Sequence, residues 1–127
     1  MKNVKFIEVK SEIGAGTRGA SLGVDALKIA AFDYGSSLFK DIASVEIKNE
    51  NDLLFEPAKT PNAKRIGGVL TVCERLADTV NQTLKKSTFP VVLSGDHSSA
   101  VGTIAGIKMA YPDKRLGVVW IDAHVDI

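Results

Sequence analysis

The chain has 127 residues, of which 45% are hydrophobic and 24% are charged, with a formal net charge of +1 at pH 7. These values predict one globular domain, or a piece of a larger one, and exclude a disordered chain. The balance of 16 basic against 15 acidic residues argues against a nucleic-acid binder that works through bulk charge. No apolar run approaches the ~18 residues of a membrane span, so no membrane association is expected. The single cysteine, Cys73, excludes an internal disulfide and predicts a reducing, cytoplasmic location.

Strands and helices are predicted to alternate along the chain. Apolar β-formers predict strands at Val4–Val9, Ala43–Lys48, Pro90–Leu93 and Leu116–Ile121. Helical periodicity and helix-breaking residues predict helices at Leu22–Phe32, Lys64–Lys86 and Ser98–Tyr111. Ser21 is the expected N-cap of the first helix, after a glycine-rich loop at Gly14–Gly23, and Asn49–Asn62 is expected to be a surface loop.

The order of these elements predicts the fold class. The runs VVL and GVVWI show no alternation of apolar and polar residues, which is typical of strands covered on both faces. We therefore expect an α/β fold, a three-layer α/β/α sandwich with a parallel sheet. Cys73 lies on the apolar stripe of the long helix Lys64–Lys86 and is interpreted as a core residue.

Ligand-type side chains follow two of the predicted strands. Asp96 and His97 come after PVVL, and Asp122, His124 and Asp126 come after GVVWI. In an extended segment the last three side chains share one face, at the strand ends where α/β proteins bind ligands. Carboxylate oxygens mixed with imidazole nitrogens favour a site for Mn²⁺, Fe²⁺, Co²⁺ or Zn²⁺.

Two interpretations of Asp96 stay open at this point. It could cap the helix that begins near Ser98, or it could orient a metal-bound His97. A single histidine at a strand end could equally be a hydrogen-bonded core residue. However, His97 and His124 are the only histidines, and both lie beside aspartates at strand ends, which favours a metal site. The glycine-rich loop matches neither a P-loop nor a dinucleotide fingerprint.

The segments SGDHSSAVGTIAGI and LGVVWIDAHVDI resemble the ureohydrolase family, which comprises arginase, agmatinase and formimidoylglutamase. The family carries a (G/S)GDHS segment followed by a strand that ends in DAH(x)D, and GTRGASLGVDAL resembles its early loop and helix. The match runs in order over Val4–Ile127, and arginase is the member it resembles most. The resemblance implies that residues 1–127 are the N-terminal portion of a single arginase-like domain.

The resemblance also implies roles for individual residues. His97 and Asp126 would ligate one Mn²⁺, His124 would ligate a second, and Asp122 would bridge both ions, with Asp96 just outside the ligands. The implied reaction is manganese-dependent hydrolysis of a small guanidino substrate, arginine to ornithine and urea. Agmatinase or formimidoylglutamase activity is the alternative. A homo-oligomer is also implied.

The family pattern continues beyond DAH(x)D with a substrate loop that contains Asn and a further His, then a D-x-D pair and a Glu. The sequence reaches only Ile127 and carries none of these, so we expect the chain alone to be inactive. Two other hypotheses are a binuclear metallophosphoesterase, whose motifs usually occur in the reverse order, and a non-catalytic assembly fragment.

Overall fold

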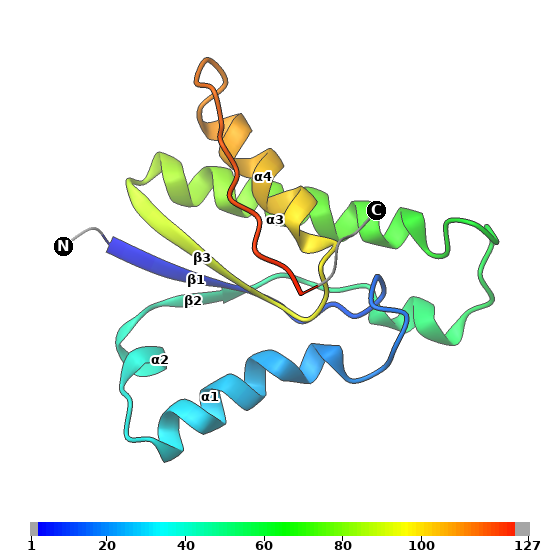
Figure 1. The fold of residues 1–127 in the computed structure, drawn as a ribbon, viewed down its shortest axis with the longest axis horizontal. Helices are drawn as coiled ribbons and strands as arrows, with labels where there is room; N and C mark the ends of the chain where they lie inside the picture. Colours follow the sequence, from blue (N-terminus) through cyan, green and yellow to red (C-terminus); the bar gives the residue numbers. More distant parts are fainter. Residues whose placement is uncertain (1–2, 124–127) are drawn as a thin grey trace.

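A computed structural model describes residues 3–123 of the chain (Figure 1). Its strands are β1 (Asn3–Val9), β2 (Ser44–Glu46) and β3 (Thr88–Ser94). Its α-helices are α1 (Gly23–Asp33), α2 (Leu38–Asp41), α3 (Ile66–Lys85) and α4 (Ser99–Ala110). Two short 3-10 helices complete the set, η1 (Ala20–Leu22) and η2 (Asn51–Phe55), the latter within the predicted surface loop. Three predicted helices and three predicted strands are confirmed, with ends that differ by a few residues.

The three strands form a parallel sheet in the order β2-β1-β3. In its register Ile7 of β1 lies opposite Val45 of β2 on one side and Val92 of β3 on the other. Parallel neighbours need crossover connections, and the helices between the strands provide them. The predicted α/β class with a parallel sheet is therefore confirmed.

Helices cover both faces of this sheet (Figure 1). In β1 the side chains alternate, so that buried Ile7 and Val9 face α3, whereas Glu8 faces α1. The ammonium group of Lys28 in α1 lies 2.6 Å from the Glu8 carboxylate, which ties this helix to the sheet. The layers are therefore α1, the sheet, and α3 with α4, as expected for a three-layer sandwich.

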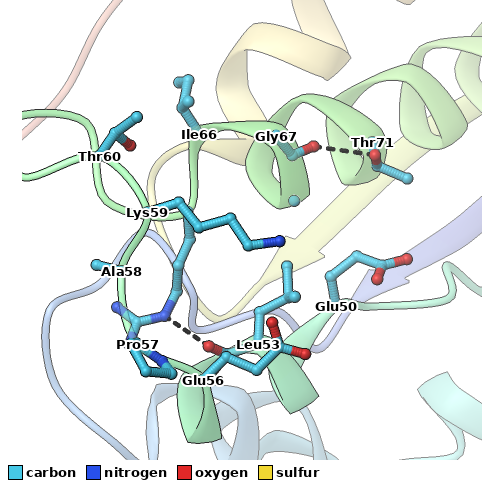
Figure 2. Close-up of a pocket in the computed structure, with 12 residues that line it drawn as sticks. Glu50, Leu53, Glu56, Pro57, Ala58, Lys59, Thr60, Ile66, Gly67 and Thr71 are labelled. Atoms are coloured by element: carbon cyan, nitrogen blue, oxygen red, sulfur yellow. Dashed lines mark hydrogen bonds between the residues drawn. The ribbon is translucent and has the colours of Figure 1, made fainter.

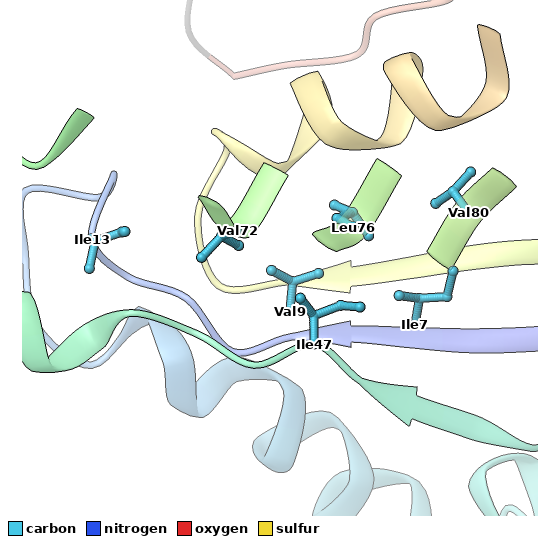
Figure 3. Close-up of a cluster of buried hydrophobic side chains, with 7 residues drawn as sticks. All are labelled: Ile7, Val9, Ile13, Ile47, Val72, Leu76 and Val80. Atoms are coloured by element: carbon cyan, nitrogen blue, oxygen red, sulfur yellow. The ribbon is translucent and has the colours of Figure 1, made fainter. Parts of the chain in front are cut away.

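The hydrophobic core lies between β1 and α3 (Figure 3). Val72, Leu76 and Val80 follow one another at intervals of four residues, so they form one stripe along α3 that packs on Ile7 and Val9. Behind them α4 packs closely on α3. A Cβ added at Gly102 would lie 2.6 Å from the carbonyl oxygen of Cys73, so the two helix backbones nearly touch. Cys73 is buried between them, which confirms its predicted place in the core.

The predicted strand Leu116–Ile121 is wrong for this structure, because the segment makes no sheet pairing with any described residue. Figure 1 shows it as an extended trace beside α4 and β3. Val118 and Trp120 line an open pocket of about 350 Å³ together with residues of β3 and α4. Val119 and Ile121 point away and are 89% and 93% exposed. The strand-like alternation is thus present without the hydrogen-bond ladder that would make a strand.

No helix in the described part of the chain has both the length and the apolar character needed to cross a membrane.

Candidate metal centre

The loops that follow β1 and β3 meet at one edge of the sheet because both strands run in the same direction. The amide of Gly95, just after β3, donates a hydrogen bond of 3.0 Å to the carbonyl of Val9, the last residue of β1. A Cβ at Gly95 would lie 2.4 Å from the Ser11 carbonyl oxygen and 2.9 Å from that of Ala20. Only glycine allows this approach, so Gly95 sets the position of the Asp96–His97 turn under the glycine-rich loop.

Asp96 joins this turn to the glycine-rich loop. One carboxylate oxygen accepts hydrogen bonds from the amide of Ser98, at 3.0 Å, and from its hydroxyl. The other accepts one from the amide of Gly14 at 3.2 Å. These contacts join the turn to the loop rather than cap α4, whose cap position is Ser98 with no side-chain hydrogen bond, so the capping interpretation of Asp96 is wrong. Its role beside a metal-bound His97 stays a prediction.

His97 and Asp122 come from different segments and lie together at this edge. The Nδ1 atom of His97 is 3.1 Å from a carboxylate oxygen of Asp122, whose side chain is only 15% exposed. The His97 ring also stacks on the indole of Trp120, with ring centroids 4.7 Å apart and planes inclined by 24°. Two of the four predicted ligands are therefore neighbours, although they are 25 positions apart in the chain.

His124 and Asp126, the other two predicted ligands, lie outside the described residues. Within residues 3–123 no group of three or more His, Cys, Asp or Glu side chains is placed to hold a metal ion. The His97–Asp122 pair therefore comprises the described members of the predicted ligand set.

Sequence reasoning missed Glu12, which organises the glycine-rich loop. This buried carboxylate accepts hydrogen bonds from the amides of Gly19 and Ser21 and from the Ser21 hydroxyl, at 2.8–3.2 Å. It also pairs with the Arg18 guanidinium at 2.7 Å. The Ser21 hydroxyl and amide bonds are the main reason that the pKa of Glu12 lies below its usual value.

The prediction that Ser21 caps α1 is therefore wrong. The cap position of α1 is Leu22, with no side-chain hydrogen bond, because the Ser21 hydroxyl donates to Glu12 instead. A lone acidic residue before a glycine-rich stretch carries no periodic or motif signal. Nothing in the sequence alone could have marked Glu12 as the anchor of this loop.

A separate cavity of about 430 Å³ lies between the 50–60 loop and the first turn of α3 (Figure 2). Its lining is mixed in charge, with Lys59 and Arg65 opposed by Glu50 and Glu56. The Arg65 Nε donates to the carbonyl of Leu53 at 2.9 Å, which ties the loop to the helix. Neither His97 nor Asp122, the described members of the predicted ligand set, lines this cavity.

Comparison with known proteins identifies the family of the chain. The model of the arginase family matches residues 2–127. The arginase of Bacillus subtilis is 34% identical over 131 residues, which cover 99% of this chain and 42% of that protein. The chain thus spans about two fifths of the length of this relative.

Solved structures show the same relationship. Entamoeba histolytica arginase in complex with L-ornithine aligns with a TM-score of 0.80 and 29% identity, over 98% of this chain and 42% of that one. The native arginase from Bacillus caldovelox aligns with a TM-score of 0.76 and 34% identity, over the same two shares. The chain belongs to the arginase family.

Proposed function

We propose that the protein to which this chain belongs hydrolyses a guanidino substrate with the help of manganese, converting arginine to ornithine and urea. In this proposal residues 1–127 are the N-terminal portion of a single arginase-like domain. The observation that carries it is the 3.1 Å contact between His97 and Asp122, two motif residues from separate segments. Membership of a family of hydrolases supports the kind of reaction.

The residues at this edge fit a divalent cation. Neighbouring ligand atoms of an octahedral ion with bonds of about 2.1 Å lie about 3.0 Å apart, close to the Nδ1–carboxylate separation of His97 and Asp122. Imidazole nitrogen with carboxylate oxygen is a donor set that suits Mn²⁺. The same distance also fits a direct hydrogen bond, so the pair is compatible with the protein before and after it binds a metal.

The remaining ligand assignments rest on the family resemblance. Trp120 and Asp122 both contact His97. The DAH(x)D motif of the family implies that His124 and Asp126 complete the ligand set. We therefore propose His97, Asp122 and Asp126 for one ion and Asp122 with His124 for the other, with Asp96 holding the turn from outside.

When bound, two Mn²⁺ ions would lower the pKa of a water molecule enough for it to attack the guanidinium carbon at neutral pH. The chain's own residues prepare this site. Gly95 and Asp96 fix the turn that carries His97, and the Asp122 carboxylate holds the imidazole edge. By the family resemblance, the groups that would orient the amino-acid end of arginine belong to the part of the pattern beyond DAH(x)D.

We propose that the 127-residue polypeptide alone does not turn over arginine. Asp122 and Asp126 supply two negative charges, which cannot balance two divalent ions, so the second ion would bind weakly. A misplacement of about 1 Å of reacting groups can cost on the order of a hundredfold in rate. A site with an incomplete ligand set should therefore fall far below an enzyme-like rate.

The proposal also covers the substrate, the oligomeric state and the location of the protein. The Entamoeba histolytica arginase structure contains L-ornithine, which favours arginine over agmatine or formiminoglutamate. We also propose a homo-oligomer, as the family resemblance implies. A cytoplasmic location fits the single reduced thiol, Cys73.

The test is a urea-release assay with Mn²⁺ and arginine. It compares the 127-residue chain with the same chain fused to the remaining length of Bacillus subtilis arginase, and with the fusion that carries Asp122→Asn. We expect urea only from the unmodified fusion. Release by the short chain would contradict the argument about an incomplete ligand set. An inactive fusion would be tested on agmatine and formiminoglutamate, and then on phenyl phosphate; phosphatase activity alone, or no turnover, would refute the proposal.

A further inference from the structure

Trp120 is not one of the proposed metal ligands, but it contacts one of them, His97. It is the only tryptophan of the chain, and its indole is half-exposed on a segment that belongs to no sheet. Its indole nevertheless stacks on the His97 imidazole, with centroids 4.7 Å apart and planes inclined by 24°. A stack this close selects one orientation of the ring plane.

A histidine ring needs two kinds of contact before one nitrogen points in a fixed direction. Its χ2 torsion is broad and roughly two-fold, so neither the plane nor the flip is set by the side chain itself. A stacking partner fixes the plane but leaves the flip open, because a half-turn exchanges Nδ1 with a ring carbon in the same plane. A hydrogen-bonding or ionic partner at the edge selects the flip.

One contact of each kind reaches His97 from one short segment of the described chain. Trp120 supplies the face contact and Asp122, two residues later, supplies the edge contact at 3.1 Å. Side chains at positions i and i+2 of an extended segment point the same way, so the spacing places both against the same ring. Ile121 lies between these two residues and Val119 just before them, and both side chains are directed to solvent.

We propose that Trp120 is a positioning residue of the metal centre, which fixes the plane of the His97 imidazole so that Nδ1 is presented beside the Asp122 carboxylate. The inference rests on the proposed metal-binding function. Residues that orient a ligating histidine typically change metal affinity by about 10–100-fold when they are removed. Trp120 contacts the face of the His97 ring, whereas Asp122 contacts its edge.

The test compares Trp120→Leu, which keeps an apolar side chain without a ring, with Trp120→Phe, which keeps a flat ring. Calorimetric titration of the 127-residue chain with Mn²⁺ alone measures affinity. We expect about tenfold weaker binding for the leucine variant and less than about threefold for the phenylalanine variant. Trp120 lies outside the buried core, so both variants are expected to fold, which far-ultraviolet circular dichroism checks.

A second readout needs no metal. The chain has two histidines, so the His97 ring protons can be assigned in NMR spectra by comparison with a His124→Gln variant. The indole should shift these protons upfield, and Trp120→Leu should abolish that shift. Equal Mn²⁺ affinity of the leucine variant and the starting protein would overturn the positioning role. Ring-proton shifts that do not depend on Trp120 would overturn the stack itself. Absence of Mn²⁺ binding by the starting protein, with the stack intact, would refute the metal centre and with it a role toward metal.

Discussion

Substitution of Gly95 by alanine should disturb the candidate site through the backbone. The added Cβ would lie 2.4 Å from the Ser11 carbonyl oxygen and 2.9 Å from that of Ala20, and contacts below 3.0 Å do not persist. The turn must therefore move by about 0.6 Å or more in a densely packed region. Neither neighbour can rotate away, because both are main-chain atoms.

The cost of this displacement has two parts. Overpacking in a well-packed region destabilises a protein by about 1–3 kcal/mol, and we expect the upper half of this range because backbone must shift. The movement also carries Asp96 and His97, so Nδ1 shifts relative to the Asp122 carboxylate. A perturbation of this kind should weaken Mn²⁺ binding by about tenfold.

Urea denaturation followed by circular dichroism measures the first effect, and calorimetric titration with Mn²⁺ measures the second. Gly67→Ala is the matched control, since Gly67 lies in α3 with nothing within 4 Å of an added Cβ. Alanine is favoured over glycine inside a helix by about 0.5–1 kcal/mol, so this variant should be slightly stabilised and bind Mn²⁺ normally. A Gly95→Ala variant with unchanged stability and affinity would refute the reasoning.

Three further predictions concern the loop anchor, the core and the exposed segment. Hydrogen bonds, mainly from Ser21, lower the pKa of Glu12 in the folded state, so its ionised carboxylate stabilises the fold at pH values above the unfolded-state pKa. This stabilisation is lost as the pH falls through the folded-state pKa. The free energy of unfolding of Glu12→Gln, measured by urea denaturation, should therefore fall less steeply below about pH 4.5 than that of the starting protein; equal slopes in the two proteins would contradict this. Leu76→Ala removes a fully buried side chain, and urea denaturation should show a loss of about 2–5 kcal/mol; a loss below about 1 kcal/mol would contradict its core position. Val119 and Ile121, which are exposed on the segment after α4, should make the chain self-associate in light scattering, and lysine at both positions should reduce this; a monodisperse monomer would contradict it.

The sequence predicted those elements whose signal is local or periodic. Helical spacing of Val72, Leu76 and Val80 predicts α3, and the unbroken apolar run of β3 predicts a buried strand. Each pattern is informative because burial of these side chains stabilises the element that it predicts. The sites at strand ends were also predictable, since parallel strands place their carboxyl ends together. Gly95 after β3 lies beside the end of β1 for this reason, whereas Asp122 reaches His97 from a segment that is not a strand.

Contacts set by tertiary neighbours were not predictable. The apolar run Leu116–Ile121 has strand composition, but a strand also needs a hydrogen-bonded neighbour, and this segment has none among the described residues. Ser21 has a good capping side chain, yet Glu12 competes for its hydroxyl from nine residues away. The His97–Trp120 stack likewise depends on where the chain returns after α4, which no local pattern encodes.

Calorimetric titration with Mn²⁺ of the starting chain, Asp122→Asn and Asp96→Asn tests the central claim most directly. Both substitutions preserve shape and remove one negative charge at the same edge of the sheet. Because Asp122 contacts His97 whereas Asp96 binds the amides of Gly14 and Ser98, the account predicts at least about tenfold weaker binding for Asp122→Asn and a clearly smaller loss for Asp96→Asn. Equal losses in the two variants, or no Mn²⁺ binding by the starting chain, would contradict it.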